Sequence, residues 1–381
     1  MKTDHPRDRP VGALNGVSVL DLSRLLPGPM CSWYLRGLGA TVTKVEQPGV
    51  GDYLRHFPPF GADGLSVWFA ALNAGARSVA LDLRRPPGRE ALLALLTETD
   101  VLIEGFRPGV MKRLGLDPVE LRQRFPRLVI ASISGFGQDG PHRERPGHDL
   151  GYCGLAGTLS TAARRDETGA PDVPGVQLAD IAGGALTTAF GIAAALFRRE
   201  VSGEGDWLDV SMTDAVLPFL VPALTQQATT GEVTPGDELL TGGSPSYRVY
   251  RCADGALLAF APLEPQFQAT AQAVLDDVAG ESVPWTVEAI SAVLATLTRD
   301  VWADKLGQAC VEPVLELREG LTHPLHRHRG TIRGSGSATR VAPPLAGPRG
   351  FVGAPAPALG ADTTAALEAV GFDSSRLSGA G

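Results

Sequence analysis

The stretch GVSVLDLSRLLPGPMCSWYLRGLGATVTKVEQ, residues 16–47, decides the fold. Residues 16–23 and 40–47 are short apolar runs containing β-branched side chains, and both predict buried strands. Residues 27–39 lie between them, begin with proline and predict a helix. A strand, a helix and a second strand in so short a segment indicate parallel strands joined by a crossover helix.

The same alternation continues along the first half of the chain. Further buried strands are expected at 78–83, 100–106, 128–134 and 207–212, with helices between them at 89–99, 117–125 and 181–200. Strands and helices in alternation predict an open α/β fold, a parallel sheet covered by helices.

The composition changes after this region. Residues 229–246 are rich in Gly, Thr, Pro and Ser and indicate a linker, whereas 247–330 contain a hairpin signal at Asp254-Gly255 followed by helical segments. We therefore expect a large α/β domain at 1–225, a small α+β domain at 226–330 and a C-terminal segment at 331–381 that returns to the large domain.

Composition restricts the functions of this 381-residue chain. It is 44% hydrophobic and carries a net charge of −8, which argues against nucleic acid as its partner. Its four cysteines are scattered, as expected of reduced thiols in a cytoplasmic protein. The start has no signal-peptide pattern and no window of about 18 residues is apolar and charge-free, so we expect no membrane association.

The segment SGFGQDGPHRERPGHDLGY, residues 134–152, concentrates unusual residues. Its glycines permit a tight loop after a strand, and His148 and Asp149 stand where a helix should begin. Asp180, at the predicted N-cap of helix 181–200, follows His148 by 32 residues (180 − 148). Capping is the ordinary explanation for both aspartates. Because ligands of α/β proteins bind at the carboxyl ends of strands, a converging His/Asp pair is the functional alternative.

Four other charged residues are candidates for ligand binding or catalysis. Arg77 and Arg107 lie beside predicted strands, and an arginine followed by Pro-Gly suits a bidentate grip on phosphate. Lys44 lies inside a predicted strand and is expected to reach an anionic ligand from its end. Glu264 directly follows a predicted strand. It is either a hydrogen-bond partner of a catalytic group or a solvated loop residue. The histidines of HPLHRHR, residues 323–329, lack accompanying ligands, so we expect no metal site.

Motifs spread along almost the whole chain resemble the class III CoA-transferases and their α-methylacyl-CoA racemase branch. They are residues 14–48, LNAGARSVALDL, DVLIEGFRPGVMKRLGLDP, SGFGQDGP, PGHDLGY, LADIAGG, GEGDWLDVSMTDA and YRCADGALLAFAPLEPQF. The resemblance implies a Rossmann-like large domain, an interlocked homodimer and an acyl-CoA thioester as substrate.

Two motifs favour the racemase branch. Racemases resemble this chain in carrying GHD-x-x-Y, here Gly147 to Tyr152, and EPQF, here starting at Glu264. Asp180 does not discriminate, because transferases use an aspartate at that position as an acylated nucleophile. The chain departs from the family where a basic residue is often found and it has Ala76, and where racemases usually have arginine and it has Lys44.

The resemblance implies that His148 and Asp180 interconvert (R)- and (S)-2-methylacyl-CoA thioesters by moving the α-proton through an enolate. Asp149, Tyr152 and Glu264 would position His148, with Glu264 supplied by the second subunit. No cofactor beyond the substrate's own CoA is expected. The implied CoA-binding residues are Lys44, Ala74, Gly75, Ala76, Arg77, Arg107 and Gly147. Two alternatives remain: a CoA-transferase with Asp180 as nucleophile, and a non-catalytic acyl-CoA-binding protein.

Overall fold

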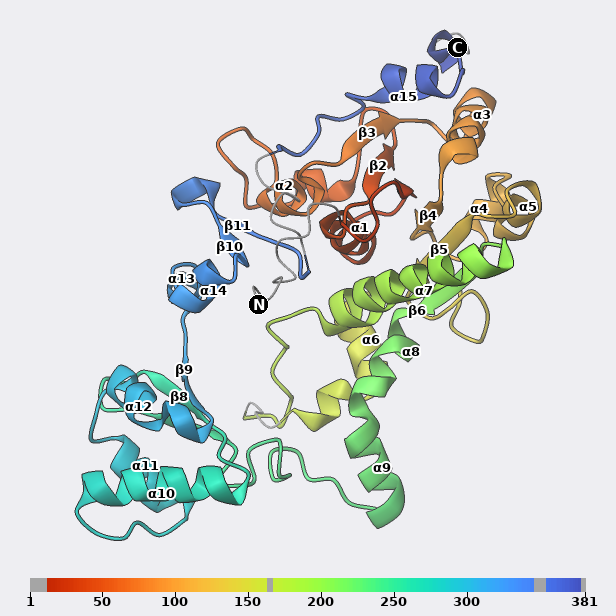
Figure 1. Ribbon diagram of the computed structural model, residues 1–381. Helices are drawn as coiled ribbons and strands as arrows, with labels where there is room; N and C mark the ends of the chain where they lie inside the picture. Colours follow the sequence, from red (N-terminus) through yellow and green to blue (C-terminus); the bar gives the residue numbers. More distant parts are fainter. Residues whose placement is uncertain (1–11, 163–166, 346–353, 378–381) are drawn as a thin grey trace. The chain divides into compact units, whose positions relative to one another are not determined.

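A six-stranded parallel sheet forms the centre of the larger of two compact units in the computed structural model, which describes residues 12–162, 167–345 and 354–377. Its strands lie in the order β3-β2-β1-β4-β5-β6 (Figure 1). The direction of the order reverses between β1 and β4, as in Rossmann-type sheets. The predicted open α/β fold is confirmed. The strands are β1 Ser18–Asp21, β2 Thr41–Glu46, β3 Arg77–Ala80, β4 Val101–Glu104, β5 Val129–Ser134 and β6 Trp207–Ser211.

The central strands are apolar because both of their faces are covered. Every residue of β4 and β5 is buried, and Val19 in β1 lies opposite Val42 and Val101 in register. Strands buried on both sides lack polar alternation, which is why the sequence shows them as short continuous apolar runs.

Helices cover both faces of this sheet. On one face α3, α5 and α15 contribute Leu92, Leu121 and Leu367 to a core that includes Leu20 of β1. The next residue of β1, Asp21, points to the opposite face, where Ser32 of α1 donates a hydrogen bond to it. The helices of this unit include α1 Pro27–Gly37, α2 Val67–Asn73, α3 Pro86–Leu95, α4 Val110–Arg113, α5 Pro118–Arg124, α6 Asp149–Ala156, α7 Thr187–Ser202, α8 Met212–Val216 and α15 Thr363–Ala369.

The helix predicted at 181–200 begins as a π-helix. The π-helical segment spans Ala179–Leu186 and continues into α7. Its N-cap is Leu178 rather than Asp180, which lies within the first turn, so the predicted capping role of Asp180 is wrong. By length and hydropathy, Ala179–Ser202 is also the described helix that would suffice to cross a bilayer, and 44% of its apolar window is buried. Core helices of water-soluble domains meet the same criteria.

The second unit has its own three-stranded antiparallel sheet, β7 Arg248–Arg251, β8 Leu257–Phe260 and β9 Val311–Val314. The turn at Gly255, which has a φ of 78°, joins β7 and β8 as a hairpin. Trp302 and Phe260 are fully buried in its core. Its longer helices are α9 Val221–Thr230, α10 Pro265–Ala279, α11 Val287–Leu294 and α12 Arg299–Leu306, and the shorter α13 Leu317–Gly320 follows. The short helix α14 Pro324–His328 spans the boundary at which the chain passes back into the larger unit.

The division between the units differs slightly from the predicted domain limits. The second unit comprises the described residues of Gly157–Val173 and Phe219–His326, so it starts before 226 and takes in a separate early segment. The C-terminal part from Arg327 belongs to the larger unit. There the Asp362 carboxylate accepts the Ser78 N–H at 2.8 Å, which attaches this segment to β3.

Candidate active site

The loops that follow β1, β4 and β5 line a cavity of about 320 Å³ in the larger unit. Parallel strands place their carboxyl ends at one edge of the sheet, and this edge is where open α/β proteins bind ligands. Predicted site residues that line the cavity are Arg107, Gly147, His148, Tyr152 and Asp180. The structure therefore brings the predicted histidine and aspartate to a common cavity.

His148 is the last residue before α6, and its side chain is exposed. Its carbonyl oxygen accepts the N–H groups of Gly151 at 2.9 Å and Tyr152 at 3.2 Å, which joins it to the first turn of the helix. Gly147 approaches the Tyr152 ring so closely that a Cβ would stand 2.5 Å from a ring carbon. Only glycine fits there, and the close packing fixes the direction from which the chain reaches His148.

Asp149 links the two candidate catalytic residues. Its Oδ1 accepts the backbone N–H of Asp180 at 2.9 Å, so this carboxylate binds the start of the π-helical segment. The ordinary explanation, in which Asp149 caps its own helix, is therefore replaced by a bond between two helices. Asp149 is the first residue of α6 and directly follows His148. The bond therefore holds the start of α6 against the start of the π-helical segment.

Burial, assisted by the nearby Asp149 carboxylate, raises the pKa of Asp180 to about 7. At neutral pH the group therefore exchanges readily between acid and base. Burial together with Asp180 also raises the pKa of Tyr152 to about 12, so the phenol stays neutral. The Tyr152 ring lies edge-on to Phe136, with ring centroids 5.2 Å apart.

The charge of the cavity is predominantly positive. Arg24, Arg107, Arg143 and Arg145 line it, and Asp180 is the one carboxyl group among its described lining residues. Arg143 pairs with Glu144 at 3.3 Å, outside the lining. Guanidinium groups gathered around a concave site favour an anionic ligand, which they bind with charge-assisted hydrogen bonds.

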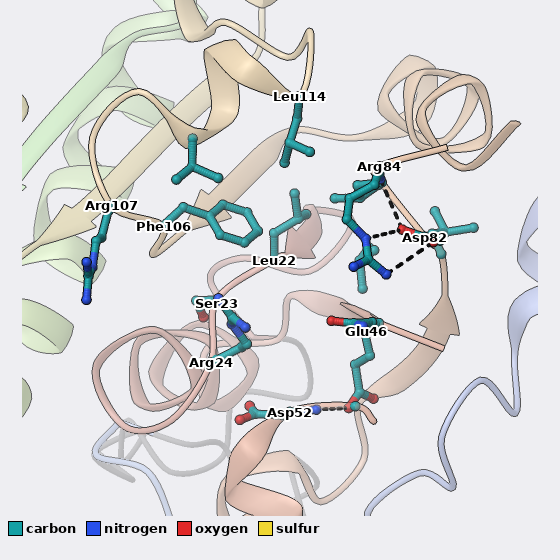
Figure 2. A pocket seen from close by; sticks show the side chains of 16 residues that line it. Leu22, Ser23, Arg24, Glu46, Asp52, Asp82, Arg84, Phe106, Arg107 and Leu114 are labelled. Carbon is teal, nitrogen blue, oxygen red and sulfur yellow. Dashed lines mark hydrogen bonds and ion pairs between the residues drawn. The ribbon is translucent and has the colours of Figure 1, made fainter. Parts of the chain in front are cut away.

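A second cavity of about 480 Å³ lies at the carboxyl ends of β1, β2, β3 and β4, beside the point where the strand order reverses (Figure 2). It shares Ser23, Arg24, Phe106 and Arg107 with the first. Figure 2 shows the Phe106 ring pointing toward Leu22 and Leu114, while Arg107 extends away from them. An N–H bond from Phe106 to the buried Glu104 carboxylate, 2.8 Å long, fixes this turn.

Lys44 is placed differently from its prediction. Its side chain is fully buried, and its Nζ lies 2.9 Å from Asp52 Oδ2 and 3.8 Å from Asp21 Oδ2. Burial acts to lower the pKa of Lys44, but the two carboxylates outweigh it and raise that pKa above its ordinary value. The charge of the ammonium group is thus balanced by carboxylates inside the protein. The prediction that Lys44 reaches an anionic ligand is wrong.

Ala74, Gly75, Ala76 and Arg77 precede β3 or begin it, so they lie at the amino end of the sheet, opposite the two cavities. The N–H of Gly75 donates to the carbonyl of Pro355 in the C-terminal segment at 3.1 Å. In this structure these four residues are separated from His148 by the length of the sheet. Glu264 belongs to the second unit, where it is the exposed residue preceding α10.

Sequence reasoning missed several residues that line the cavities. Ser23, Arg24 and Leu25 follow β1 directly, and Arg84 follows β3. Their signal was their place immediately after a predicted strand on either side of the point where the order reverses. Arg143 and Arg145 lie in the loop before His148, where the sequence pattern does not distinguish an arginine that lines a cavity from a solvated one.

A parallel Rossmann-type sheet with a positively charged cavity at its carboxyl edge is typical of α/β proteins that bind anionic ligands, and the family comparison identifies the class. CoA-transferase family III matches residues 14–363, and the chain belongs to that family. It is 36% identical to human alpha-methylacyl-CoA racemase over 333 residues, 84% of this chain and 82% of the relative.

Two further comparisons mark the breadth of the family. The chain is 40% identical to the acetyl-CoA:oxalate CoA-transferase of Acetobacter aceti over 229 residues, 59% of this chain and 57% of the relative. The crystal structure of a CAIB/BAIF family protein from Brucella suis superimposes with a TM-score of 0.80 at 25% identity, covering 94% of this chain and 100% of the other. The family thus contains relatives named for racemisation and relatives named for CoA transfer.

Proposed function

We propose that the protein is a 2-methylacyl-CoA racemase that uses His148 and Asp180 as its two acid/base groups. The observation that carries the proposal is their presence in one positively charged cavity, with burial holding the pKa of Asp180 near 7. A group whose pKa lies near the working pH serves equally as proton donor and proton acceptor. The similarity to the human racemase over most of the chain supports the same activity.

Racemisation requires one group on each face of the α-carbon. The first removes the α-proton, electron density moves into the thioester carbonyl to form an enolate, and the second returns a proton to the opposite face. Imidazole with carboxylic acid serves one direction and imidazolium with carboxylate the other. Each group of this kind typically contributes about 10²–10⁴-fold to the rate.

The second cavity suits the nucleotide portion of CoA. Leu22, Leu81, Leu83 and Leu114 supply apolar walls, and it lies where dinucleotides bind in Rossmann-type sheets. The guanidinium groups of Arg24 and Arg107 line both cavities, as contacts to the phosphates between adenosine and the pantetheine arm would require.

An interlocked homodimer is part of the proposal, with Glu264 of a second copy approaching His148. The exposed face of the helix Ala179–Ser202 supports association, because Phe190, Phe197 and Val201 are 75%, 78% and 85% exposed. Apolar side chains gathered on one helix face are typical of interfaces. Light scattering of the wild type and of Phe197→Lys tests this: a dimer in the first and a shift toward monomer in the second are expected.

CoA transfer is the competing function, favoured by the oxalate CoA-transferase relative. It would use Asp180 as a nucleophile that forms an acyl anhydride, leaving His148 without a role. Incubation with (R)- or (S)-2-methylacyl-CoA in deuterium oxide separates the two functions. Deuterium at C2 with inversion is expected for the racemase, whereas CoA exchange onto a free acid with no label at C2 would show the transferase.

A further inference from the structure

The loop between β1 and α1 has a strained backbone at the edge of both cavities. Leu25 adopts a φ of 67°, in the left-handed region that side chains with a Cβ rarely enter. Ser23 and Arg24 line both cavities, and Leu25 lines the one that holds His148 and Asp180. Such a conformation persists only where surrounding contacts enforce it.

A buried ionic cluster, consisting of Lys44, Asp21 and Asp52, supplies those contacts. Asp52 Oδ1 accepts the Leu25 N–H at 2.9 Å, and Lys44 Nζ donates to the Ser23 carbonyl at 2.9 Å. Asp21 Oδ1 accepts the Ser23 N–H at 2.8 Å. Every member of the cluster thus binds the loop backbone directly.

The members of the cluster also pair with one another. Lys44 joins Asp52 at 2.9 Å and lies 3.8 Å from Asp21, and all three residues are 1% exposed or less. The Asp52 N–H in turn donates to Glu46 Oε2 at 2.8 Å, and Glu46 is paired with Arg55. Removing the one ammonium group would leave the carboxylates of Asp21 and Asp52 buried without the cation that both approach, which would push the loop from its conformation.

Arg24 shows how the loop conformation reaches the ligand. Its guanidinium carbon lies 4.8 Å from the centroid of the Tyr53 ring and 5.4 Å from that of Phe106. Tyr53 is the residue after Asp52, so the same cluster fixes both the backbone that carries Arg24 and one of the rings on which it stacks. This holds the guanidinium group at the wall shared by the two cavities.

We propose that Lys44 is a positioning residue for CoA binding: without touching the ligand, it holds Ser23–Leu25 in the strained conformation that places Arg24. The proposal rests on the proposed function in taking a CoA thioester as the ligand. The proposal goes beyond that function because it assigns a role to Lys44, a buried cation that no ligand reaches.

The test is a double-mutant cycle between Lys44→Met and Leu25→Gly, read as the Kd of free CoA by titration calorimetry and as the KM and kcat of racemisation. Lys44→Met should weaken CoA binding by about 5- to 30-fold, the equivalent of the roughly 1–2 kcal/mol that a left-handed non-glycine residue costs. KM should rise in parallel, with kcat changing by less than about threefold. Glycine adopts this conformation without strain, so the double variant should bind CoA within about twofold of Leu25→Gly alone.

Arg199→Met is the matched control. Arg199 is also a buried cation of the larger unit, paired with Asp100 at 2.9 Å at the amino end of the sheet. It should lower the unfolding temperature without changing the Kd of CoA. If Lys44→Met does not fold, Asp52→Asn replaces it in the same cycle, because it removes the same ionic contact.

Three results would overturn the proposal: unchanged CoA affinity in Lys44→Met, no recovery on adding Leu25→Gly, or an equal loss of affinity in Arg199→Met. CoA affinity is measured independently of turnover, so a wild-type enzyme that binds CoA but does not racemise would contradict the proposed function alone. The cycle would then still decide the role of Lys44.

Discussion

The two ends of the parallel sheet differ in what their arginines contact. At the amino end Arg199 pairs with Asp100 at 2.9 Å, and Asp100 also accepts the Ser18 N–H at 2.8 Å. At the carboxyl end Arg107 and Arg145 line a cavity, and the described part of the chain offers neither an ion-pair partner. Arg199 thus joins α7 to the start of β4 at the amino end, whereas the carboxyl end has arginines that a ligand can reach in addition to the paired charges of Lys44, Asp21 and Asp52.

This contrast has an energetic consequence. Removing one partner of a buried ion pair destabilises the protein, because it leaves an uncompensated charge, whereas a partly buried carboxyl group such as Asp180 destabilises it whenever the group is ionised. Perturbed ionisable groups are typical of functional sites, because they serve chemistry at the expense of folding. Substitution of the cavity-lining residues at the carboxyl end should consequently change activity, whereas substitution of the paired residues at the amino end should change stability alone.

The largest effect is expected from His148→Ala. Removing one of the two groups that flank the α-carbon should slow racemisation by at least about 10²–10⁴-fold, because a proton can no longer be delivered to one face. Asp180 would still act on its own face, so one enantiomer should exchange its α-proton in deuterium oxide without inversion. Chiral analysis of the labelled thioester measures both outcomes.

His326→Ala, which changes a histidine of the second unit, is the control and should leave the racemisation rate unaltered. Undiminished racemisation by His148→Ala would remove the assignment of two bases. It would also contradict the assignment of catalysis to the cavity at the carboxyl end of the sheet.

Asp180→Asn should abolish racemisation and yet stabilise the protein at high pH. The folded state holds the Asp180 proton until about pH 7, whereas the unfolded chain releases it near pH 4. Between these values the unfolded state binds fewer protons, so the wild type loses stability as pH rises. The variant cannot ionise, and at pH 8 its free energy of unfolding should exceed that of the wild type by about 2–4 kcal/mol.

Urea unfolding at pH 4 and pH 8 measures this difference. At pH 4 the wild type and Asp180→Asn should differ little, since the carboxyl group is protonated in the folded state. Asp139→Asn, at an exposed carboxylate, should show no comparable gain at pH 8. An Asp180→Asn variant less stable than the wild type at pH 8 would show that the protein binds the carboxylate favourably, and Asp180 would then not destabilise the fold.

Arg107→Gln should weaken substrate binding at the carboxyl end. Losing one charge-assisted hydrogen bond to a phosphate costs about 1.5–3 kcal/mol, which corresponds to a rise in KM of roughly 10- to 100-fold. Arg107→Lys keeps the charge but loses the planar guanidinium fork, so its KM should lie between those of the wild type and Arg107→Gln. Steady-state kinetics with 2-methylacyl-CoA provides the measurement, and an unchanged KM in Arg107→Gln would exclude this arginine from the binding site.

The parts of this site that the sequence predicted are those specified by local pattern. Short apolar runs located the strands of the sheet, and the segment before His148 identified the loop that carries it. His148 and Asp180 both lie in the long connection between β5 and β6, one directly before α6 and the other in the π-helical segment. The hydrogen bond from the Asp180 N–H to Asp149 holds the two segments together at the carboxyl edge of the sheet.

The sequence could not predict pairings between distant residues. Lys44 appeared as a free cation within a strand, since nothing local shows that Asp52, from a loop eight residues later, closes over it at 2.9 Å. The left-handed Leu25 was equally invisible, because glycine is the residue that usually marks such a position. The start of the helix at Ala179, one residue before Asp180, was not predictable either, because the Asp180 N–H is bonded to Asp149, 31 residues earlier in the chain.

Arg77→Gln is the sharpest test of the amino end, because the smallest effect is expected there. Arg77 is exposed at the start of β3, and the family resemblance had placed it at the CoA. Surface substitutions away from special features typically change stability by less than about 0.5 kcal/mol, and KM should stay within about twofold of the wild type. A tenfold rise in KM, measured beside Arg107→Gln, would show that ligand reaches the amino end of a sheet, through a second copy of the chain or otherwise. Both ends of the sheet would then contribute to CoA binding, and Arg77 would be a ligand-binding residue at the end where the arginines are expected to serve structure alone.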